Sequence, residues 1–220
     1  MSLNLVNFDI IKKIGEGGFG EVFEVKEKET GKIFAAKISF DSLKNESCET
    51  IRNLSREINI ISKLYYPSIV KFVGYSPNNF KNKPKPVLIT EYLSNGSLND
   101  LINLERKGLC KNEWTITKKI INIYGIASAM SYLHAHNIIH RDLKPDNILI
   151  DDFLHPKVAD FGLSKISHSN ESMTFKSTAN IKGTPIYMAP EILKSYEYTQ
   201  AGDVYAFAFI VYEIITLEKP

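Results

Sequence analysis

The chain has 220 residues, of which 44% are hydrophobic and 24% are charged. This length and hydrophobic content exclude a chain that is disordered throughout, and they suit one large domain or one domain in two lobes. The 27 basic and 25 acidic residues leave a net charge of +2, so the charge predicts no nucleic acid partner and no anionic membrane surface.

The first predicted strand runs into the glycine-rich sequence GEGGFGEV, and a second β-rich run follows it. The pattern G-x-G-x-x-G-x-V is met by Gly15, Gly17, Gly20 and Val22. Glycines let backbone N–H groups approach phosphate oxygens without a Cβ in the way. Because a strand follows instead of an amphipathic helix, a dinucleotide-binding βα turn is disfavoured. A glycine-rich hairpin without a ligand is the alternative interpretation.

The next strand is predicted over 33–40, where Ile33, Ala35 and Lys37 alternate onto one face. A lysine that shares a face with a small alanine is badly placed for a solvated edge. We therefore expect Lys37 to have a specific partner, with an ordinary exposed lysine as the alternative.

A helix is predicted between residues 47 and 65, because apolar residues recur there at spacings of three and four. These residues are Ile51, Leu54, Ile58, Ile61 and Tyr65. Glu57 falls inside their apolar arc. A buried carboxylate is costly unless a cation meets it, so the helix predicts an ion pair through Glu57.

Two further strands, IVKFVGY and VLITEYL, are predicted over 69–75 and 87–93. After Gly96 the pattern becomes helical, with apolar spacings of three and four over 98–104 and 116–130. An apolar run over 204–217 predicts a further, buried helix. Strands before and helices after predict an α+β architecture with a small β-rich lobe and a larger helical lobe.

Three short polar motifs lie in the second half: HRDLKPDN over 140–147, DFG over 160–162 and APE over 189–191. Taken alone, an Asp or Asn in a loop is usually a turn residue. Here the glycine loop, the strand lysine, the helix glutamate and these three motifs follow one another in a specific order. On these residues the chain resembles the eukaryotic protein kinases over about residues 8–220.

The resemblance implies catalytic roles for Asp142, Lys144, Lys37 and Glu57. Asp142 would accept the proton of the substrate hydroxyl, and Lys144 would balance charge on the transferred phosphoryl group. Lys37 would pair with the α- and β-phosphates of ATP and with Glu57.

The resemblance also implies binding sites for Mg²⁺ and ATP. Asn147 and Asp160 would hold the metal ion, because magnesium prefers oxygen ligands. Thr90 would be the gatekeeper, and the backbone of Glu91 and Leu93 would bind the adenine edge. The residues expected to bind the nucleotide are Ile14, Gly15, Glu16, Gly17, Gly18, Phe19, Gly20, Val22, Ala35, Lys37, Thr90, Glu91, Leu93 and Leu149.

The implied fold has two lobes. A small lobe over 8–93 would hold a five-stranded antiparallel sheet and one long helix, and a larger, mainly helical lobe over 94–220 would be incomplete at its C-terminus. Family members continue with further helices, one of which supplies an arginine for the APE glutamate. This chain has no arginine after Arg141, so Glu191 is expected to lack that partner.

The implied activity is an ATP-dependent protein serine/threonine kinase. Lys144 together with Gly183-Thr184-Pro185 is typical of serine/threonine kinases, whereas the hinge TEYLSNGSL is closer to tyrosine kinases. This mixture indicates the tyrosine-kinase-like group of serine/threonine kinases. The alternative is a truncated, catalytically weak module of the pseudokinase kind that binds nucleotide or acts as a scaffold.

The expected partners are a protein substrate with a Ser or Thr acceptor and an upstream kinase acting on the 164–184 loop. Arg141 would bind a phosphate group attached to that loop. The candidate acceptors are Ser167, Ser169, Ser172, Thr174, Ser177 and Thr178.

The remaining features predict a cytoplasmic protein. Cys48 and Cys110 show no CxxC spacing, which fits a reducing compartment. The N-terminal sequence does not read as a signal peptide. The apolar run over 204–217 is interrupted by Glu213 and is shorter than the roughly 20 residues of a membrane span, so no span is expected.

Overall fold

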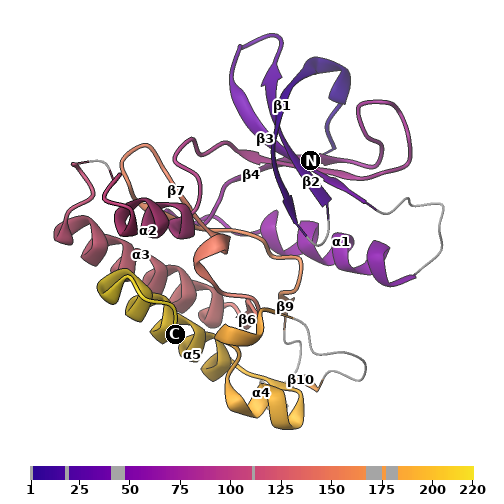
Figure 1. The fold of residues 1–220 in the computed structure, drawn as a ribbon. Coiled ribbons are helices and arrows are strands. Elements are labelled where there is room, and N and C mark those ends of the chain that lie inside the picture. The colour runs from indigo at the N-terminus through magenta and orange to yellow at the C-terminus, as the bar shows by residue number, and fades with distance from the viewer. Residues whose placement is uncertain (1, 18–19, 41–47, 111, 167–174, 177–182) are drawn as a thin grey trace. The chain divides into compact units, whose positions relative to one another are not determined.

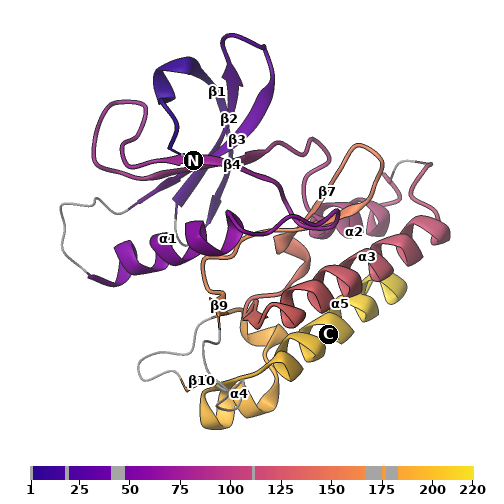
Figure 2. The ribbon, with the colours of Figure 1, turned by 180° about the vertical axis from the view of Figure 1, so that it is seen from behind.

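The computed structural model describes residues 2–17, 20–40, 48–110, 112–166, 175–176 and 183–220. The chain divides into two compact units. The β unit comprises Met1–Tyr65 and Val70–Leu93, and the helical unit comprises Tyr66–Ile69 and Ser94–Pro220. Both units are drawn in Figure 1 and, from behind, in Figure 2.

The β unit is one antiparallel sheet with a single α-helix, α1, among its described residues. Its elements are the 3-10 turn Leu5–Asn7, β1 (Phe8–Gly17), β2 (Gly20–Glu27), β3 (Ile33–Ser39), α1 (Cys48–Ile61), β4 (Phe72–Ser76) and β5 (Val87–Glu91). The strand order is β1-β2-β3-β5-β4, and every neighbouring pair is antiparallel. The predicted five-stranded antiparallel sheet is confirmed.

One face of this sheet carries an apolar core. The buried members of the core are Leu5, Phe8, Val25, Phe34, Ala36, Val87 and Ile89. They alternate along each strand, as expected of a sheet with one covered face. The N-terminal segment joins them, because the Leu3 N–H donates to the Tyr75 carbonyl at 2.8 Å.

The helical unit consists of helices and short strand pairs. Its elements are α2 (Leu98–Arg106), α3 (Ile116–Ala135), β6 (Ile138–Ile139), the 3-10 turn Pro145–Asn147, β7 (Ile148–Ile150), β8 (Pro156–Val158), β9 (Lys165–Ile166), β10 (Phe175–Lys176), the 3-10 turn Pro185–Tyr187, α4 (Pro190–Ser195), β11 (Glu197–Tyr198) and α5 (Gln200–Thr216). The strands pair as β6 with β9, β7 with β8 and β10 with β11. Helices α3 and α5 pack on each other and run side by side in Figures 1 and 2.

The long helices of this unit begin at side-chain caps. Ser97 forms a capping box with Asp100 at the start of α2, and the Thr115 and Thr199 side chains accept N–H bonds at the starts of α3 and α5. Such caps satisfy N–H groups that have no partner within the helix. They fix where α2, α3 and α5 start.

The short segment Tyr66–Ile69 follows α1 in the chain but packs within the helical unit. The Tyr66 ring stacks on the Tyr132 ring of α3 with centroids 4.7 Å apart, and its hydroxyl is hydrogen-bonded to Ser128. The Val158 N–H donates to the Ser68 carbonyl at 2.8 Å. The chain therefore enters the helical unit briefly before β4 and returns to it after Leu93.

Two predicted helices have different limits in the structure. Helix α1 ends at Ile61, and Tyr65, which was expected in its apolar arc, is 85% exposed. Turn-type bonds such as Leu64 N–H to Ile61 carbonyl replace the α-helical pattern before Pro67. Helix α5 begins at Gln200, because Thr199 caps it.

Candidate active site

The β unit brings Lys37 and Glu57 together. Lys37 lies on β3 and Glu57 on α1, and the Lys37 ammonium donates to Glu57 Oε1 at 3.0 Å. Glu57 is 4% exposed, so its carboxylate needs a cation. The periodicity of the helix predicted a carboxylate inside an apolar arc, and the structure supplies the lysine that satisfies it.

The glycine-rich sequence forms the facing ends of β1 and β2. Gly15 pairs with Val22, and Gly17 pairs with Gly20. A Cβ on Gly20 would lie 2.2 Å from the Ile38 carbonyl oxygen, so no other residue fits there. A Cβ on Gly15 would meet nothing closer than 3.9 Å. Gly18 and Phe19 lie outside the described residues.

Residues expected around the nucleotide base lie on β3 and β5. Ala35 pairs with Thr90 across the two strands. The Thr90 hydroxyl donates to the Glu91 carbonyl at 3.2 Å, and the Glu91 N–H donates to the Lys71 carbonyl at 2.9 Å. Leu93 is half-buried just after β5.

Two further residues predicted to bind the nucleotide, Ile14 and Leu149, belong to different units and differ in how far they are buried. Ile14 is 40% exposed on β1. Nearby, Lys13 forms ion pairs with Glu16 and, at 2.8 Å, with Glu21. Leu149 is half-buried on β7 of the helical unit.

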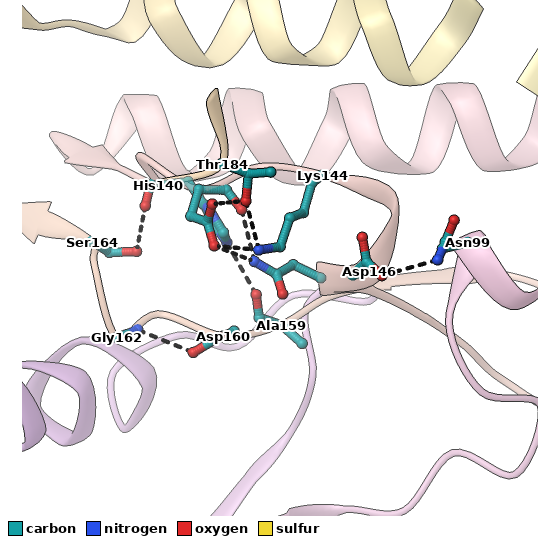
Figure 3. Close-up of polar contacts among 11 residues, drawn as sticks. Asn99, His140, Lys144, Asp146, Ala159, Asp160, Gly162, Ser164 and Thr184 are labelled. Atoms are coloured by element: carbon teal, nitrogen blue, oxygen red, sulfur yellow. Dashed lines mark hydrogen bonds and ion pairs between the residues drawn. The ribbon is translucent and has the colours of Figure 1, made fainter. Parts of the chain in front are cut away.

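The helical unit holds three predicted residues in one hydrogen-bonded group with Thr184 (Figure 3). The Lys144 ammonium lies 2.9 Å from Asp142 Oδ2 and donates to the Thr184 hydroxyl at 2.8 Å. That hydroxyl donates to Asp142 Oδ1 at 2.9 Å. Each oxygen of the Asp142 carboxylate thus has a positioned donor, and the group is half-buried.

Asn147 completes this group and is oriented by it. Its amide nitrogen donates to the Asp142 carbonyl at 2.7 Å and to Asp142 Oδ2 at 3.1 Å. Because the nitrogen faces Asp142, the amide oxygen is left as an oxygen donor of the kind Mg²⁺ prefers. Asn147 is 7% exposed, which holds this orientation.

The backbone before Asp142 is held by Asp203 at the start of α5. The two Asp203 carboxylate oxygens accept the N–H groups of His140 and Arg141, both at 2.9 Å. Arg141 has a φ of 72°, a conformation that is strained for a residue with a side chain. The bonds to the 3% exposed Asp203 offset that strain and fix the loop.

The DFG segment is tied to the same loop. The His140 imidazole donates through Nε2 to the Ala159 carbonyl at 3.0 Å, and its ring meets Phe161 edge-on with centroids 5.4 Å apart. The Ala159 N–H donates to the Asn147 carbonyl at 2.9 Å. These bonds place Asp160 one residue beyond a segment fixed to Asn147. Figure 3 shows the bond between His140 and Ala159, with Asp160 beside it.

Asp160 itself has the geometry of a constrained ligand residue. Its φ is 60°, and its Oδ1 accepts the Gly162 N–H at 3.4 Å. The half-exposed carboxylate and the Asn147 amide oxygen are both hard oxygen donors, so they fit a magnesium ion that completes its shell with water and phosphate oxygens. Within the described residues, no group of three or more His, Cys, Asp or Glu forms a separate metal site.

The structure shows contacts of three further residues that the sequence did not predict. Thr184 was used only as a mark of substrate class, yet its hydroxyl contacts both Asp142 and Lys144. His134, to which the sequence analysis gave no role, is half-buried and hydrogen-bonded to Asp203 at 2.9 Å. Glu213 is 0% exposed and accepts a bond from the Tyr187 hydroxyl. Its signal was an acidic residue inside an apolar run, the same signal that revealed Glu57.

The six candidate phosphorylation sites lie outside the described residues. The arginine expected to contact a phosphate there, Arg141, has its guanidinium over the Tyr198 ring at 3.9 Å from the centroid. Tyr198 belongs to β11, which pairs with the 175–176 strand of the same loop. Glu191, at the end of the APE motif, forms no ion pair with any of the residues that the structure describes.

Comparison with known proteins agrees with this geometry. The family model of the protein kinase domain matches residues 8–220. The chain belongs to the protein kinase family.

The relatives similar in sequence include kinases of Arabidopsis thaliana and of Dictyostelium discoideum. The chain is 35% identical over 222 residues to Serine/threonine-protein kinase CTR1 of Arabidopsis thaliana, an alignment that covers 100% of this chain and 25% of the relative. It is 37% identical over 206 residues to Probable serine/threonine-protein kinase drkD of Dictyostelium discoideum, covering 93% of this chain and 14% of the relative.

A third relative is Calmodulin-binding receptor-like cytoplasmic kinase 2 of Arabidopsis thaliana, at 32% identity over 219 residues. That alignment covers 97% of this chain and 51% of the relative. The chain therefore spans about half, or less, of the length of these three relatives.

Proposed function

We propose that the chain is the catalytic domain, over 8–220, of an ATP-dependent protein serine/threonine kinase. The observation that carries the proposal is the group in which Asp142, Lys144 and Thr184 are mutually hydrogen-bonded. A carboxylate held beside an ammonium and a hydroxyl can accept a proton from an incoming alcohol while the ammonium offsets negative charge. The names of the serine/threonine kinase relatives support the substrate class.

The reaction transfers the γ-phosphoryl group of ATP to a serine or threonine hydroxyl. The substrate oxygen forms a bond to phosphorus, its proton goes to Asp142, and the bond from phosphorus to the bridging oxygen of ADP breaks. Lys144, whose ammonium lies 2.9 Å from Asp142 Oδ2, would balance charge on the phosphoryl oxygens. Positioning and charge stabilisation supply most of the rate in such reactions.

Mg²⁺ would neutralise phosphate charge, and Asn147 and Asp160 would hold it. Asn147 is suited to this because its amide nitrogen is bonded to Asp142, and Asp160 because its backbone follows a segment bonded to Asn147. Lys37, fixed by Glu57 at 3.0 Å, would bind the α- and β-phosphates. The predicted nucleotide contacts on β1, β2, β3 and β5, and Leu149 on β7, remain part of this proposal.

The proposed partners are a protein that presents a serine or threonine hydroxyl and an upstream kinase that phosphorylates the 164–184 loop. We place the protein in signal transduction and in the cytoplasm, the location given in the name of one relative. Among the described residues, no helix is both long enough and apolar enough to cross a membrane.

The direct test is a phosphotransfer assay with the chain, ATP, Mg²⁺ and a generic protein substrate such as casein. We expect phosphoserine and phosphothreonine, and we expect Asp142→Asn to lower the rate by about 10²-fold or more. Asp146→Asn is the matched control, because Asp146 is an exposed carboxylate of the same loop and accepts a hydrogen bond from the Asn99 amide at 3.0 Å. Mainly phosphotyrosine in the product would overturn the proposed substrate class.

A second candidate function is a nucleotide-binding or scaffolding module with little turnover. It is favoured by Glu191, which has no ion-pair partner among the described residues although its motif position normally has one. Both candidates predict magnesium-dependent ATP binding. ATP binding without phosphotransfer above the Asp142→Asn background would select the second.

A further inference from the structure

The face of the β sheet that is turned away from the apolar core carries two charged side chains beside the residues expected around the nucleotide base. Glu24 on β2 pairs with Ala35 on β3, and Ala35 pairs with Thr90 on β5. On its other side, Glu24 pairs with Lys12 on β1. Directly opposed residues of an antiparallel sheet have their side chains on the same face. Lys12 and Glu24 therefore extend the row of Ala35 and Thr90 toward the β1 edge of the sheet.

Glu24 is buried further than most carboxylates are. Its side chain is 13% exposed, whereas the side chain of Lys12 is 63% exposed. The Lys12 ammonium lies 3.4 Å from Glu24 Oε2. Because an ion pair with one exposed partner contributes little, a carboxylate buried to this extent is expected to have a second polar contact.

Tyr92 supplies this second contact. It lies two residues after Thr90, and the alternation of side chains along a strand puts both residues on the same face. Tyr92 is half-buried. Burial raises the pKa of its phenol, the neighbouring Glu24 carboxylate raises it further, and Lys12 lowers it. The phenol, the carboxylate and the ammonium thus form one set of contacts, the Glu24 group, made of Lys12, Glu24 and Tyr92.

The Glu24 group joins two parts of the β unit that are not neighbours in the sheet. Strand β3 lies between β2 and β5, so no ladder of backbone hydrogen bonds connects β2 with the segment that follows β5. The contact between Tyr92 and Glu24 crosses β3. Ala35 is the β3 partner of Glu24, and its small side chain leaves space over the sheet at that point.

Both joined parts belong to the expected nucleotide site. The ammonium and the carboxylate come from β1 and β2, the strand pair of the glycine-rich sequence. Tyr92 lies between Glu91 and Leu93, whose backbone is expected to bind the adenine edge. This segment is fixed to the opposite end of the sheet as well, because Glu91 Oε1 accepts the Lys71 N–H at 2.8 Å.

We propose that Glu24 and Tyr92 are positioning residues for the nucleotide, because their contact holds the β1–β2 strand pair at a fixed distance from the 91–93 segment. Lys12 balances the charge of Glu24 at 3.4 Å. Glu24, Tyr92 and Lys12 are not among the residues expected to touch ATP, so they act through the backbone of those that are. The inference deepens the proposed kinase function and rests on it for the effect on nucleotide binding. The contact between the phenol and the carboxylate does not depend on that function.

The first test compares nucleotide binding by Glu24→Leu and Glu27→Leu. Both variants remove one carboxylate from β2, and Glu27 accepts its bond from the Thr30 hydroxyl at the far end of the strand. Calorimetry with adenosine, which has no phosphate groups, measures the base site without Mg²⁺. We expect the adenosine Kd to rise about tenfold in Glu24→Leu and to stay within about twofold in Glu27→Leu, since a less preorganised site binds more weakly. An unchanged Kd in Glu24→Leu would overturn the inference.

Steady-state kinetics separates positioning of the nucleotide from a general loss of structure. Tyr92→Phe keeps the ring and removes the hydroxyl, and Tyr124→Phe makes the same change at a tyrosine of α3 that is 75% exposed. We expect Tyr92→Phe to raise KM for ATP about fivefold, with kcat and the KM for a serine-containing peptide within about twofold of wild type. We expect no change in Tyr124→Phe. A fall in kcat at constant KM for ATP would contradict the inference.

A conservative change at Glu24 adds a rescue test. Glu24→Gln keeps an oxygen that can accept the Tyr92 hydroxyl, whereas Glu24→Leu has none. We expect the adenosine Kd of Glu24→Gln to stay nearer to wild type than that of Glu24→Leu. Equal losses in the two variants would show that the hydrogen-bond acceptor at this position has no part in positioning.

A double-mutant cycle tests the contact itself, apart from any activity. Urea midpoints are measured for wild type, Tyr92→Phe, Glu24→Leu and the double variant. Because both substitutions break the same contact, their shifts should not add in the double variant. Additive shifts would overturn the inference. Non-additive shifts in a chain whose wild type binds neither adenosine nor ATP would instead overturn the proposed function and leave the contact between Tyr92 and Glu24 in place.

Discussion

Helix α5 holds two buried carboxylates, one in its first turn and one in its last, and their surroundings differ. Asp203 is 3% exposed and accepts hydrogen bonds from the His140 N–H, the Arg141 N–H and the His134 imidazole, all at 2.9 Å. Glu213 is 0% exposed and accepts its bond from Tyr187 alone among the described side chains, with Arg106 at 3.7 Å.

The position on the helix adds to this difference. A negative charge is favoured near a helix N-terminus, where Asp203 lies, and disfavoured near the C-terminus, where Glu213 lies. The backbone of the catalytic loop is therefore fixed by several donors and a favourable dipole. Glu213, by contrast, receives one described side-chain hydrogen bond, from the Tyr187 phenol.

The largest expected effect follows from Asp203→Asn. The substitution keeps the shape but turns one oxygen into an NH₂ group that faces a backbone N–H. We expect the free energy of unfolding to fall by about 3 kcal/mol or more, because two charge-assisted bonds are lost or weakened. Urea unfolding followed by circular dichroism measures this, and a change below about 0.5 kcal/mol would contradict the bracing role.

A smaller effect is expected when Arg106 is replaced by methionine. Glu213 would keep Tyr187 but lose its nearby cation, and Arg106 would also lose its bonds to the Leu217 carbonyl and to Asn103 at 3.0 Å. We expect a loss of about 2 kcal/mol, which lies below the range for a fully buried pair because the Arg106 side chain is 24% exposed.

The double variant Arg106→Met with Glu213→Met sharpens this test. Replacing both partners removes the buried charge, so we expect it to recover part of the loss caused by Arg106→Met. If the double variant unfolds at lower urea than the single one, the carboxylate stabilises the fold through Tyr187 more than it destabilises it by burial.

Most of the β unit could be predicted from the sequence because its signals are local. Alternation along β3 and glycines around β2 mark strands directly, and the place of Glu57 within an apolar arc predicted its ion pair. The end of α1 could not be read in the same way, because Tyr65 fits the apolar spacing yet is exposed. The placement of Tyr66–Ile69 in the helical unit depends on stacking with Tyr132, which no local pattern predicts.

In the candidate site, too, contacts within one motif could be predicted from the sequence, and contacts between distant residues could not. Asp142, Lys144 and Asn147 lie within one motif, so their meeting follows from short loop geometry. Thr184 joins them across a separation of 42 residues from Asp142, which only the tertiary fold can create. The catalytic, nucleotide and metal roles stay predictions until activity is measured.

The cap of α5 offers a milder test at the same end of the helix as Asp203. The Thr199 hydroxyl accepts the Gly202 N–H at 3.3 Å. Thr199→Ala should lower the free energy of unfolding by about 1 kcal/mol, since an N–H of the first turn loses its partner. Thermal unfolding of the variant beside wild type measures this, and an effect as large as that of Asp203→Asn would mean that the cap, and not the carboxylate, fixes the start of the helix.

The smallest effect concerns pH and appears only in alkali. The pKa of Tyr187 is raised by burial and then by its bond to Glu213, so the folded state favours the neutral phenol. Its contribution to stability is fully present below the unfolded pKa of about 10 and declines as pH rises above that value toward the higher folded pKa. The stability advantage of wild type over Tyr187→Phe should therefore be constant from neutral pH to about pH 10 and shrink above it. Urea midpoints of the two proteins, measured in parallel at rising pH, test this. An advantage that stayed constant well above pH 10 would show that the phenol is not held neutral by its buried carboxylate.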